Sequence, residues 1–280
     1  MRVSTSQIYQ SSTDAMATSA SRTQQAQQRI SSGVRITAVS QDATAVTQAS
    51  RLQQVMAESA GYAANIDELD LRHAEADLSL SVVHDALGRL SALLITSRNG
   101  GLQSRDRTAI GAAVQAEVQI IQAELQRRDS QSRPLYNGGV ADAEHQALMV
   151  RPGQTVATAI PLDQALQDRL QALSGAAWAS GAGMAGSTDA DRAAALVEVQ
   201  ALQSSALGAR QVVGARWEQL SRAADANLAV GDSAEMARSA LVDTDVARSA
   251  SDLATYTAQL QAARAMFSRI QSTSLFDTIR

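Results

Sequence analysis

Apolar residues recur in alternating steps of three and four along residues 66–94, and this spacing constrains the fold more than any other feature. On a helix, the alternation places every member on one narrow stripe, which is the a/d pattern of helices that pack along each other. It predicts a long helix over 43–97 that needs a partner helix along its length. One polar member, His73, is interpreted as a residue that fixes the register of this pairing. The stripe consists of Ile66, Leu69, His73, Ala76, Leu80, Val83, Leu87, Leu90 and Leu94.

A second stripe with the same spacing runs through residues 253–270, and apolar residues continue beyond it. An exposed apolar stripe of this length invites association. We expect it to pack against the N-terminal helix of the same chain or against the same region of another subunit. Its members are Leu253, Tyr256, Leu260, Ala263, Phe267 and Ile270, followed by Leu275, Phe276 and Ile279.

Residues 1–33 are predicted to form a helix with a weaker stripe. As an isolated helix it would be marginal, so a partner helix would stabilise it. The alternative is a frayed N-terminus in the free monomer. Gly33 is predicted to end this helix, and Ser40, Asp42 and Thr44 are candidate caps for the next one. The residues that recur every seventh position are Tyr9, Met16, Thr23 and Ile30.

The chain then turns back on itself. Asn99-Gly100-Gly101 is a strong signal for the end of the long helix. A further helix is predicted over 104–130, with Ser104 as its cap. The two helices together would form a helical hairpin.

Residues 136–187 differ in character from the helical segments. The run at 147–160 alternates around the turn Arg151-Pro152-Gly153-Gln154 and predicts a β-hairpin. A short helix is expected around 163–173. The Gly/Ala/Ser-rich stretch 174–187 is interpreted as a flexible loop.

Helical pattern resumes after the cap signal Thr188-Asp189 and continues to about residue 230. Gly231-Asp232 is predicted to interrupt it, so that the last helix begins near Ser233.

The predicted fold class is mainly α: a long antiparallel helical bundle or coiled coil built from both chain ends, with a small β-containing insert in the middle. Three domains are expected. The first is a terminal coiled-coil assembly domain (1–42 plus 233–280), and the second is a helical rod domain (43–135 plus 188–232). The third is a small inserted domain that contains the β-hairpin (136–187).

Composition argues against several classes of function. The chain has no Cys, which excludes disulfide frameworks and thiolate sites. Its net charge of −4 gives no electrostatic case for a nucleic-acid partner. We find no run of about 18 apolar residues, so no membrane partner is expected. The N-terminus also lacks the apolar segment of a cleavable signal peptide.

No constellation of an enzyme, cofactor or metal site is visible. The three histidines, His73, His84 and His145, are scattered without convergent carboxylates. Asp243 and Asp245 are interpreted as helix caps rather than as a cation site. We therefore expect a protein that is not an enzyme and that binds no cofactor or metal.

Both ends of the chain resemble the bacterial flagellin family. The resemblance covers about 1–135 and 190–280, and the 136–187 segment carries little of it. The start and the Ser-Leu-Phe-Asp ending look more like the hook–filament junction members than the filament-forming members. One departure lies at Val39-Ser40-Gln41-Asp42-Ala43, where the family usually has two prolines; their loss should make this connection less rigid. The matching segments are MRVSTSQIYQ, QQRISSGVRITAVSQDATAVTQASRLQ, NIDELDLRHAEADLSLSVVHDALGRLSALLITSRNG and LVDTDVARSASDLATYTAQLQAARAMFSRIQSTSLFDTIR.

The resemblance implies a secreted structural subunit of the bacterial flagellum, located at the hook–filament junction. It implies a ring of copies of this chain, with hook-associated protein 1 on the hook side and flagellin on the filament side. It also implies export through the flagellar type III channel, with an export chaperone at the C-terminal helix. Two alternatives stay open: a small flagellin that forms the filament itself, and a secreted coiled-coil binding module.

The residues expected to form the self-assembly interface are the large apolar members of the two terminal stripes. They are Ile8, Tyr9, Met16, Ile30, Leu253, Tyr256, Leu260, Phe267, Ile270, Leu275, Phe276 and Ile279.

Overall fold

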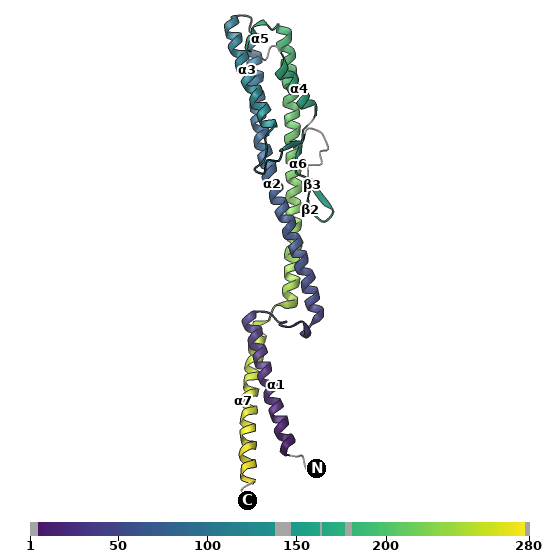
Figure 1. Cartoon of the computed structure of the whole chain (residues 1–280), viewed down its shortest axis with the longest axis vertical. Helices are drawn as coiled ribbons and strands as arrows, with labels where there is room; N and C mark the ends of the chain where they lie inside the picture. The colour runs from purple at the N-terminus through teal and green to yellow at the C-terminus, as the bar shows by residue number, and fades with distance from the viewer. Residues whose placement is uncertain (1–4, 138–146, 163, 177–180, 278–280) are drawn as a thin grey trace. The chain divides into compact units, whose positions relative to one another are not determined.

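The computed structural model describes residues 5–137, 147–162, 164–176 and 181–277 (Figure 1). The protein is mainly α-helical with a small strand-containing segment in the middle, which confirms the predicted fold class. The chain divides into two compact units. We call Met1–Ala57 with Val230–Arg280 the terminal unit, and Glu58–Ala229 the central unit.

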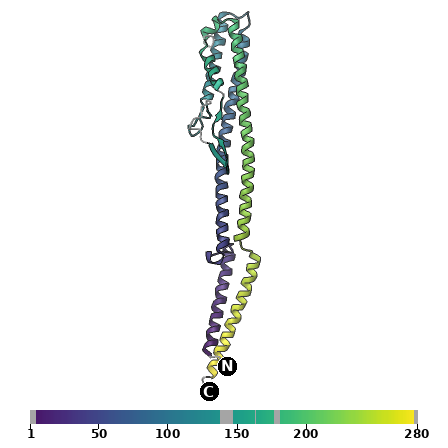
Figure 2. The same ribbon diagram turned by 90° about the vertical axis from the view of Figure 1, so that its right-hand side faces the viewer.

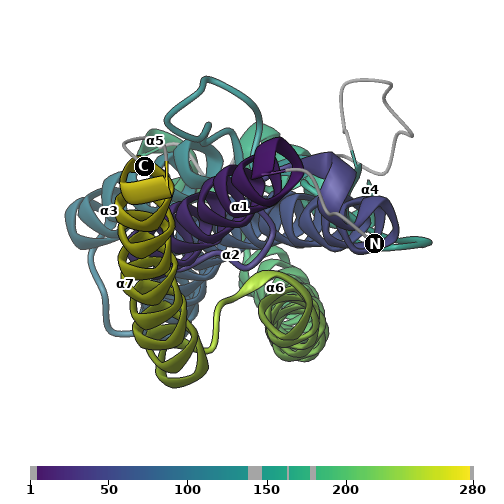
Figure 3. The ribbon, with the colours of Figure 1, turned by 90° about the horizontal axis from the view of Figure 1, so that it is seen from below.

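The terminal unit is built around the first and last helices. Helix α1 (Thr5–Ser32) and helix α7 (Val246–Asp277) lie side by side (Figures 1 and 3). They run antiparallel, because the start of α1 contacts the end of α7 while the residues after α1 bond to those before α7. A short 3₁₀ turn, η1 (Val39–Gln41), leads into the next helix. The unit also contains the first residues of α2 and the last residues of α6.

The central unit is organised around α2 (Ala43–Ser97), whose bounds match the prediction. Every member of the 66–94 stripe is buried. This stripe packs on α3 (Ser104–Leu125) and on α6 (Asp189–Val242), which lies beside α2 along this unit (Figures 1 and 2). The narrow a/d stripe thus finds the partner helices that its spacing requires.

The middle segment contains the predicted hairpin. Strand β2 (Ala147–Arg151) pairs antiparallel with β3 (Gln154–Ala157). Gly153 has a φ of 74°, a left-handed conformation that glycine adopts without strain and that suits this tight turn. A second, parallel pair joins β1 (Tyr136–Asn137) to β4 (Ile160–Pro161). The expected helix after the hairpin is α4 (Gln164–Gly175).

The arrangement of the middle segment differs from the expected separate domain, because its apolar side chains share hydrophobic clusters with the long helices. Residues of α4 pack with α2, α3 and α6, and those of β2, β3 and β4 pack with α2 and α6. The structure therefore has two units, with residues 136–187 belonging to the central one.

Part of the stretch predicted as a flexible loop is helical. Residues Gly181–Gly186 form the short helix α5, and Met184 within it is fully buried in the core with α2, α3 and α6. The side chain of Met184 anchors this segment of small residues to the core. The composition of the segment did not indicate this contact. Residues 177–180 lie outside the described part of the chain.

Two predicted helix boundaries were wrong. Helix α6 continues through Gly231-Asp232 to Val242, so the last helix begins at Val246 rather than near Ser233. One glycine inside a helix costs only about 1 kcal/mol relative to alanine, which the surrounding backbone hydrogen bonds outweigh. Helix α3 ends at Leu125 rather than near residue 130. Its cap is Gln103, whose backbone N–H donates to the Asp106 carboxylate (3.4 Å).

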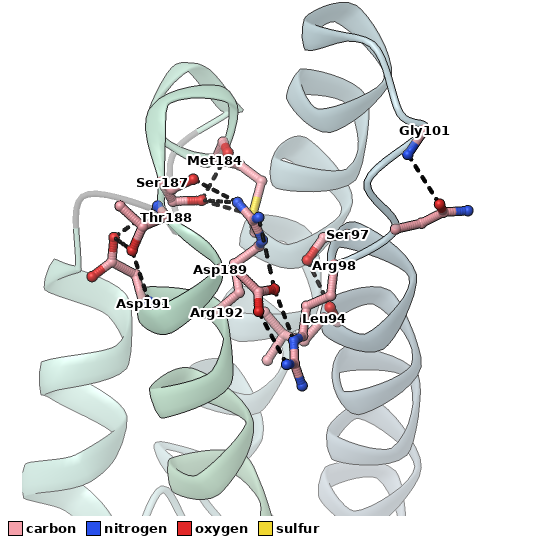
Figure 4. Close-up of polar contacts among 11 residues, drawn as sticks. Leu94, Ser97, Arg98, Gly101, Met184, Ser187, Thr188, Asp189, Asp191 and Arg192 are labelled. Atoms are coloured by element: carbon pink, nitrogen blue, oxygen red, sulfur yellow. Dashed lines mark hydrogen bonds and ion pairs between the residues drawn. The ribbon is translucent and has the colours of Figure 1, made fainter.

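Polar contacts close the end of the central unit where α2 stops and α6 starts (Figure 4). The Arg98 guanidinium donates to both carboxylate oxygens of Asp189, at 2.9 and 3.1 Å. Thr188 caps α6 as predicted: its hydroxyl accepts from the Asp191 N–H (3.2 Å), and its own N–H donates to the Asp191 carboxylate (2.8 Å). This reciprocal capping box satisfies backbone donors that the first helical turn leaves free.

By length and composition alone, α2 is apolar enough to cross a membrane, which differs from the expectation that no segment qualifies. The core helix of a soluble protein meets the same criterion, and the apolar stripe of α2 is buried against α3 and α6.

Candidate assembly surface

The antiparallel pair of α1 and α7 carries the residues expected to mediate assembly. The large side chains of the C-terminal stripe from Leu253 to Phe267 are each half-buried in α7. On α1, positions at the same three-four spacing are the half-buried or buried ones, and most of them are small. The terminal unit therefore combines a stripe of bulky side chains on α7 with a stripe of mostly small side chains on α1. The α1 positions are Ser12, Met16, Ser19, Thr23, Ala26 and Ile30.

An aromatic contact joins α1 and α7 near the start of α1. The rings of Tyr9 and Phe267 lie 4.9 Å apart between centroids and are tilted by 54°. Tyr9 remains 44 % exposed, so the contact covers only part of its ring. A tilted pair at this distance contributes about 0.5–1.5 kcal/mol beyond its buried area.

At the other end, the segments that follow α1 and precede α7 are joined by backbone hydrogen bonds. The Thr244 N–H donates to the Gly33 carbonyl oxygen (2.9 Å), and the Arg35 N–H donates to the Val242 carbonyl oxygen (2.7 Å). Gly33 has a φ of 70°, a left-handed conformation that ends α1 and brings the chain to this contact. The Arg35 side chain adds a hydrogen bond to the Leu241 carbonyl oxygen (2.7 Å).

The connection that lacks the expected prolines is held by side chains instead. The Gln41 amide accepts a hydrogen bond from the Thr37 N–H (3.0 Å) and donates one to the Thr37 hydroxyl (3.1 Å). Asp42 caps α2 by accepting from the Ala45 N–H (2.9 Å), which confirms one of the predicted caps. Local hydrogen bonds therefore replace the restriction that proline rings would impose.

One of the two carboxylates before α7 acts as the predicted cap. Asp245 accepts a hydrogen bond from the Arg248 N–H (3.0 Å) and so caps the helix. The prediction for Asp243 was wrong: it follows the end of α6, and its carboxylate accepts from the Ser239 hydroxyl one turn back in that helix. Among the residues that the structure describes, no group of three or more His, Asp or Glu side chains could hold a metal ion.

The structure brings some of the predicted interface residues together and leaves others undescribed. Met16, Ile30, Leu253, Tyr256, Leu260 and Phe267 lie at half-buried positions of the pair, whereas Tyr9 is exposed. The side chains of Ile8, Ile270, Leu275 and Phe276 fall outside the described part, as does the whole of Ile279.

Sequence reasoning missed the opposite face of α7. Alanines recur there at helical spacing, and all of them are exposed, as is the neighbouring Met266. The helical spacing of these small residues indicates the face, but a stripe defined by bulky apolar residues does not include them. These alanines are Ala247, Ala250, Ala254, Ala258, Ala262 and Ala265.

No protein-family model matches this chain, and no curated protein is similar to it in sequence. A solved structure shares its fold: a Vibrio parahaemolyticus protein described provisionally as flagellar hook-associated superposes with a TM-score of 0.63. The alignment covers 72 % of this chain and 99 % of the other, at 16 % sequence identity. At this identity the likeness establishes a shared fold.

Proposed function

We propose that this chain is a structural subunit of the bacterial flagellum, of the type of hook-associated protein 3, which forms the junction between hook and filament. The observation that carries the proposal is the half-burial of the bulky α7 stripe in a fold shared with a protein described as flagellar hook-associated. The flagellin-like sequence segments at both chain ends support the same role.

The physical argument rests on what the α1–α7 pair leaves uncovered. Two helices alone cannot enclose the stripe from Leu253 to Phe267, and its large side chains stay half-exposed. Burying the rest of each such side chain in a neighbouring subunit would contribute roughly 1 kcal/mol at about 25 cal/mol per Å². Several side chains per contact then favour assembly, while the pair remains marginal on its own.

The exposed alanine face of α7 fits the same role. Small side chains allow a second helix to approach closely, since interhelical distance depends on the side chains at the contact. In an assembled ring, the bulky stripe would pack on α1 and on one neighbouring subunit, and the alanine face would lie against another. A repeated contact of this kind between different faces closes into a ring or extends as a filament.

The specific partners belong to the proposal. They are further copies of this chain, hook-associated protein 1 on the hook side, flagellin on the filament side, and an export chaperone that covers the C-terminal helix before assembly. Secretion through the flagellar type III route would require such a chaperone, because the α7 stripe is exposed until α1 and neighbouring subunits cover it.

The test is a capping assay on isolated hooks, followed by electron microscopy. The full chain is compared with a version truncated after Thr244, which removes α7. We expect the full chain to remain soluble, to cap hook ends and to lose this activity on truncation. Long filaments from the full chain alone would show a small flagellin instead. Failure of the full chain to bind hooks or to form filaments would overturn the flagellar role.

Two point variants separate the stripe from the helix as a whole. Leu260→Asp with Phe267→Asp places two charges on the half-buried face of α7 and should abolish hook capping. Ser21→Asp with Gln25→Asp adds the same charge at exposed positions of the partner helix α1, away from both faces of α7, and should preserve it. Both variants should keep the central unit folded by circular dichroism. Equal capping by the two variants would contradict the proposed interface.

A further inference from the structure

Three segments of the central unit, in α2, in α6 and in the β3–β4 region, each contribute residues to two neighbouring hydrophobic clusters. One cluster contains Ala76 of α2, Val213 of α6 and Ile160 of β4. The other contains Leu69 of α2, Leu220 of α6 and Val156 of β3. Polar groups occupy the level between the two clusters. We call them the polar layer, which consists of Arg72, His73, Arg216 and the backbone of residues 157–159.

Two arginines in this layer hold three successive backbone carbonyls. The Arg216 guanidinium donates to the carbonyl oxygens of Ala159 (2.7 Å) and Ala157 (3.3 Å). The Arg72 Nε donates to the carbonyl oxygen of Thr158 between them (3.1 Å). The connection from β3 to β4 is therefore fixed to α2 by one guanidinium and to α6 by the other.

His73 lies in the same layer and is fully buried. Its Nδ1 is 2.6 Å from the Leu69 carbonyl oxygen, so this nitrogen carries the proton and donates. Its Nε2 is buried and has no hydrogen-bond partner among the described residues. A second ring proton, on Nε2, would have no acceptor among these residues, which favours the neutral ring.

The charges around His73 oppose its protonation. Arg72 faces it from α2 and Arg216 from α6. The nearby carboxylate of Asp129, on the segment after α3, already pairs with Arg72 and Arg133, and Glu68 pairs with Arg133. Burial, and then the charges of Arg216 and Arg72, hold the pKa of His73 below its ordinary value, against the opposing effect of the hydrogen bond to Leu69.

We propose that the polar layer is an acid-sensitive latch: protonation of His73 adds a third positive charge beside Arg72 and Arg216 and releases the 157–159 connection, with the β2–β3 hairpin, from α2 and α6. This device is independent of the assembly surface on the terminal helices.

The direction of the effect follows from proton linkage. In the released form His73 meets water and titrates near its ordinary pKa of about 6.5. The released form therefore binds the proton more readily than the latched form, and acid favours release. Because one proton is involved, the opening constant should rise by at most about tenfold per pH unit below about pH 6.5. Carboxylates with ordinary pKa values of about 4 remain ionised over the first two units of this range.

The test is amide hydrogen exchange on the full chain, read by mass spectrometry from about pH 7.5 to about pH 5.5 and corrected for intrinsic exchange rates. We expect peptides covering 147–162 to lose protection as the pH falls below about 6.5. Peptides from the middle of α3 should stay protected. Equal loss of protection throughout the chain would show global unfolding and would overturn the latch.

Variants assign the effect to one histidine. In His73→Leu the pH dependence of protection at 147–162 should disappear, since no group in the layer then titrates in this range. His73→Gln, which keeps a polar side chain, provides the same comparison if the leucine variant fails to fold. His84 lies further along α2 than His73, at a half-buried position. His84→Leu should therefore show the same pH dependence of protection at 147–162 as the unaltered chain. A pH dependence that persists without His73, or that disappears without His84, would contradict the assignment.

Discussion

Ser59 of α2 and Asn227 of α6 exchange hydrogen bonds in both directions. The Ser59 hydroxyl donates to the Asn227 carbonyl oxygen (2.9 Å), and the Asn227 amide donates to the Ser59 carbonyl oxygen (3.0 Å). Both residues are buried and lie at the end of the central unit where its boundary with the terminal unit is drawn. A buried polar pair between two long helices satisfies itself in one register only, because a shift along the helix would separate the partners.

The Ser59–Asn227 pair should therefore matter for stability. Asn227→Ala removes two side-chain contacts, the amide donation to the Ser59 carbonyl oxygen and the bond from the Ser59 hydroxyl to the amide oxygen (3.2 Å), while the Ser59 hydroxyl keeps its bond to the backbone carbonyl of residue 227. At about 0.5–1.5 kcal/mol for each contact, we expect a loss of about 1–3 kcal/mol in the free energy of unfolding. Ser59→Ala should cost less, about 0.5–1.5 kcal/mol. Urea denaturation measures both. Asp225→Ala, at an exposed position two residues away, should change the midpoint little; a loss as large as that of Asn227→Ala would contradict this account.

The contact between Tyr9 and Phe267 should couple the two terminal helices. In a double-mutant cycle with Tyr9→Ala and Phe267→Ala, we expect an interaction energy of about 0.5–1.5 kcal/mol, as for other tilted aromatic pairs. Amide exchange in α1 gives the stability of the pair. Met266 is adjacent in sequence but 68 % exposed, so Met266→Ala should combine additively with Tyr9→Ala. Additive behaviour in both cycles would mean that the contact between the two rings contributes nothing to the stability of the α1–α7 pair.

The buried carboxylate of Asp129 should make the central unit sensitive to strong acid. Burial alone would raise its pKa, but hydrogen bonds from the Arg133 N–H and guanidinium and the charge of Arg72 outweigh burial and hold the pKa below its ordinary value. Its stabilising contribution is present above the unfolded-state pKa of about 3.9 and is lost as the pH falls below it. Thermal melts from neutral to strongly acidic pH should show this loss.

Removing that carboxylate tests the same contact at neutral pH. Asp129→Asn leaves the Arg72 guanidinium buried without its ion-pair partner, and we expect a loss of about 3–5 kcal/mol in the free energy of unfolding. The control is Glu117→Gln, whose partner Arg89 has a side chain that is 53 % exposed. That variant should lose at most about 1 kcal/mol. Similar losses in the two variants would contradict the buried ion pair.

Two glycines with open space around them should respond in opposite directions to alanine. Gly33 has a positive φ, so Gly33→Ala should destabilise the terminal unit by about 1–2 kcal/mol through backbone strain alone. Gly88 lies inside α2 with a helical backbone, so Gly88→Ala should stabilise the protein by about 0.5–1 kcal/mol. Thermal denaturation distinguishes the two signs, and equal signs would show that φ does not decide the outcome.

Local patterns predicted the helical part of the fold well. The bounds of α2, the end of α1 at Gly33 and the cap of α6 at Thr188 follow from spacing and from capping residues, which act within one or two turns. The break expected at Gly231-Asp232 was wrong, because a weak local stop signal does not outweigh the backbone hydrogen bonds of a 54-residue helix. The helical turn around Met184 was missed, because one anchoring side chain leaves no periodicity to detect.

The order of residues by itself determined which face of each long helix must be buried, since helical geometry converts three-four spacing into a stripe without reference to the rest of the chain. Only the tertiary structure decided what covers each stripe. It joined the middle segment to the core of the central unit and placed Arg72, His73 and Arg216 in one layer against the 157–159 carbonyls. Contacts between residues so far apart in sequence depend on how whole elements pack, and no local repeat encodes them.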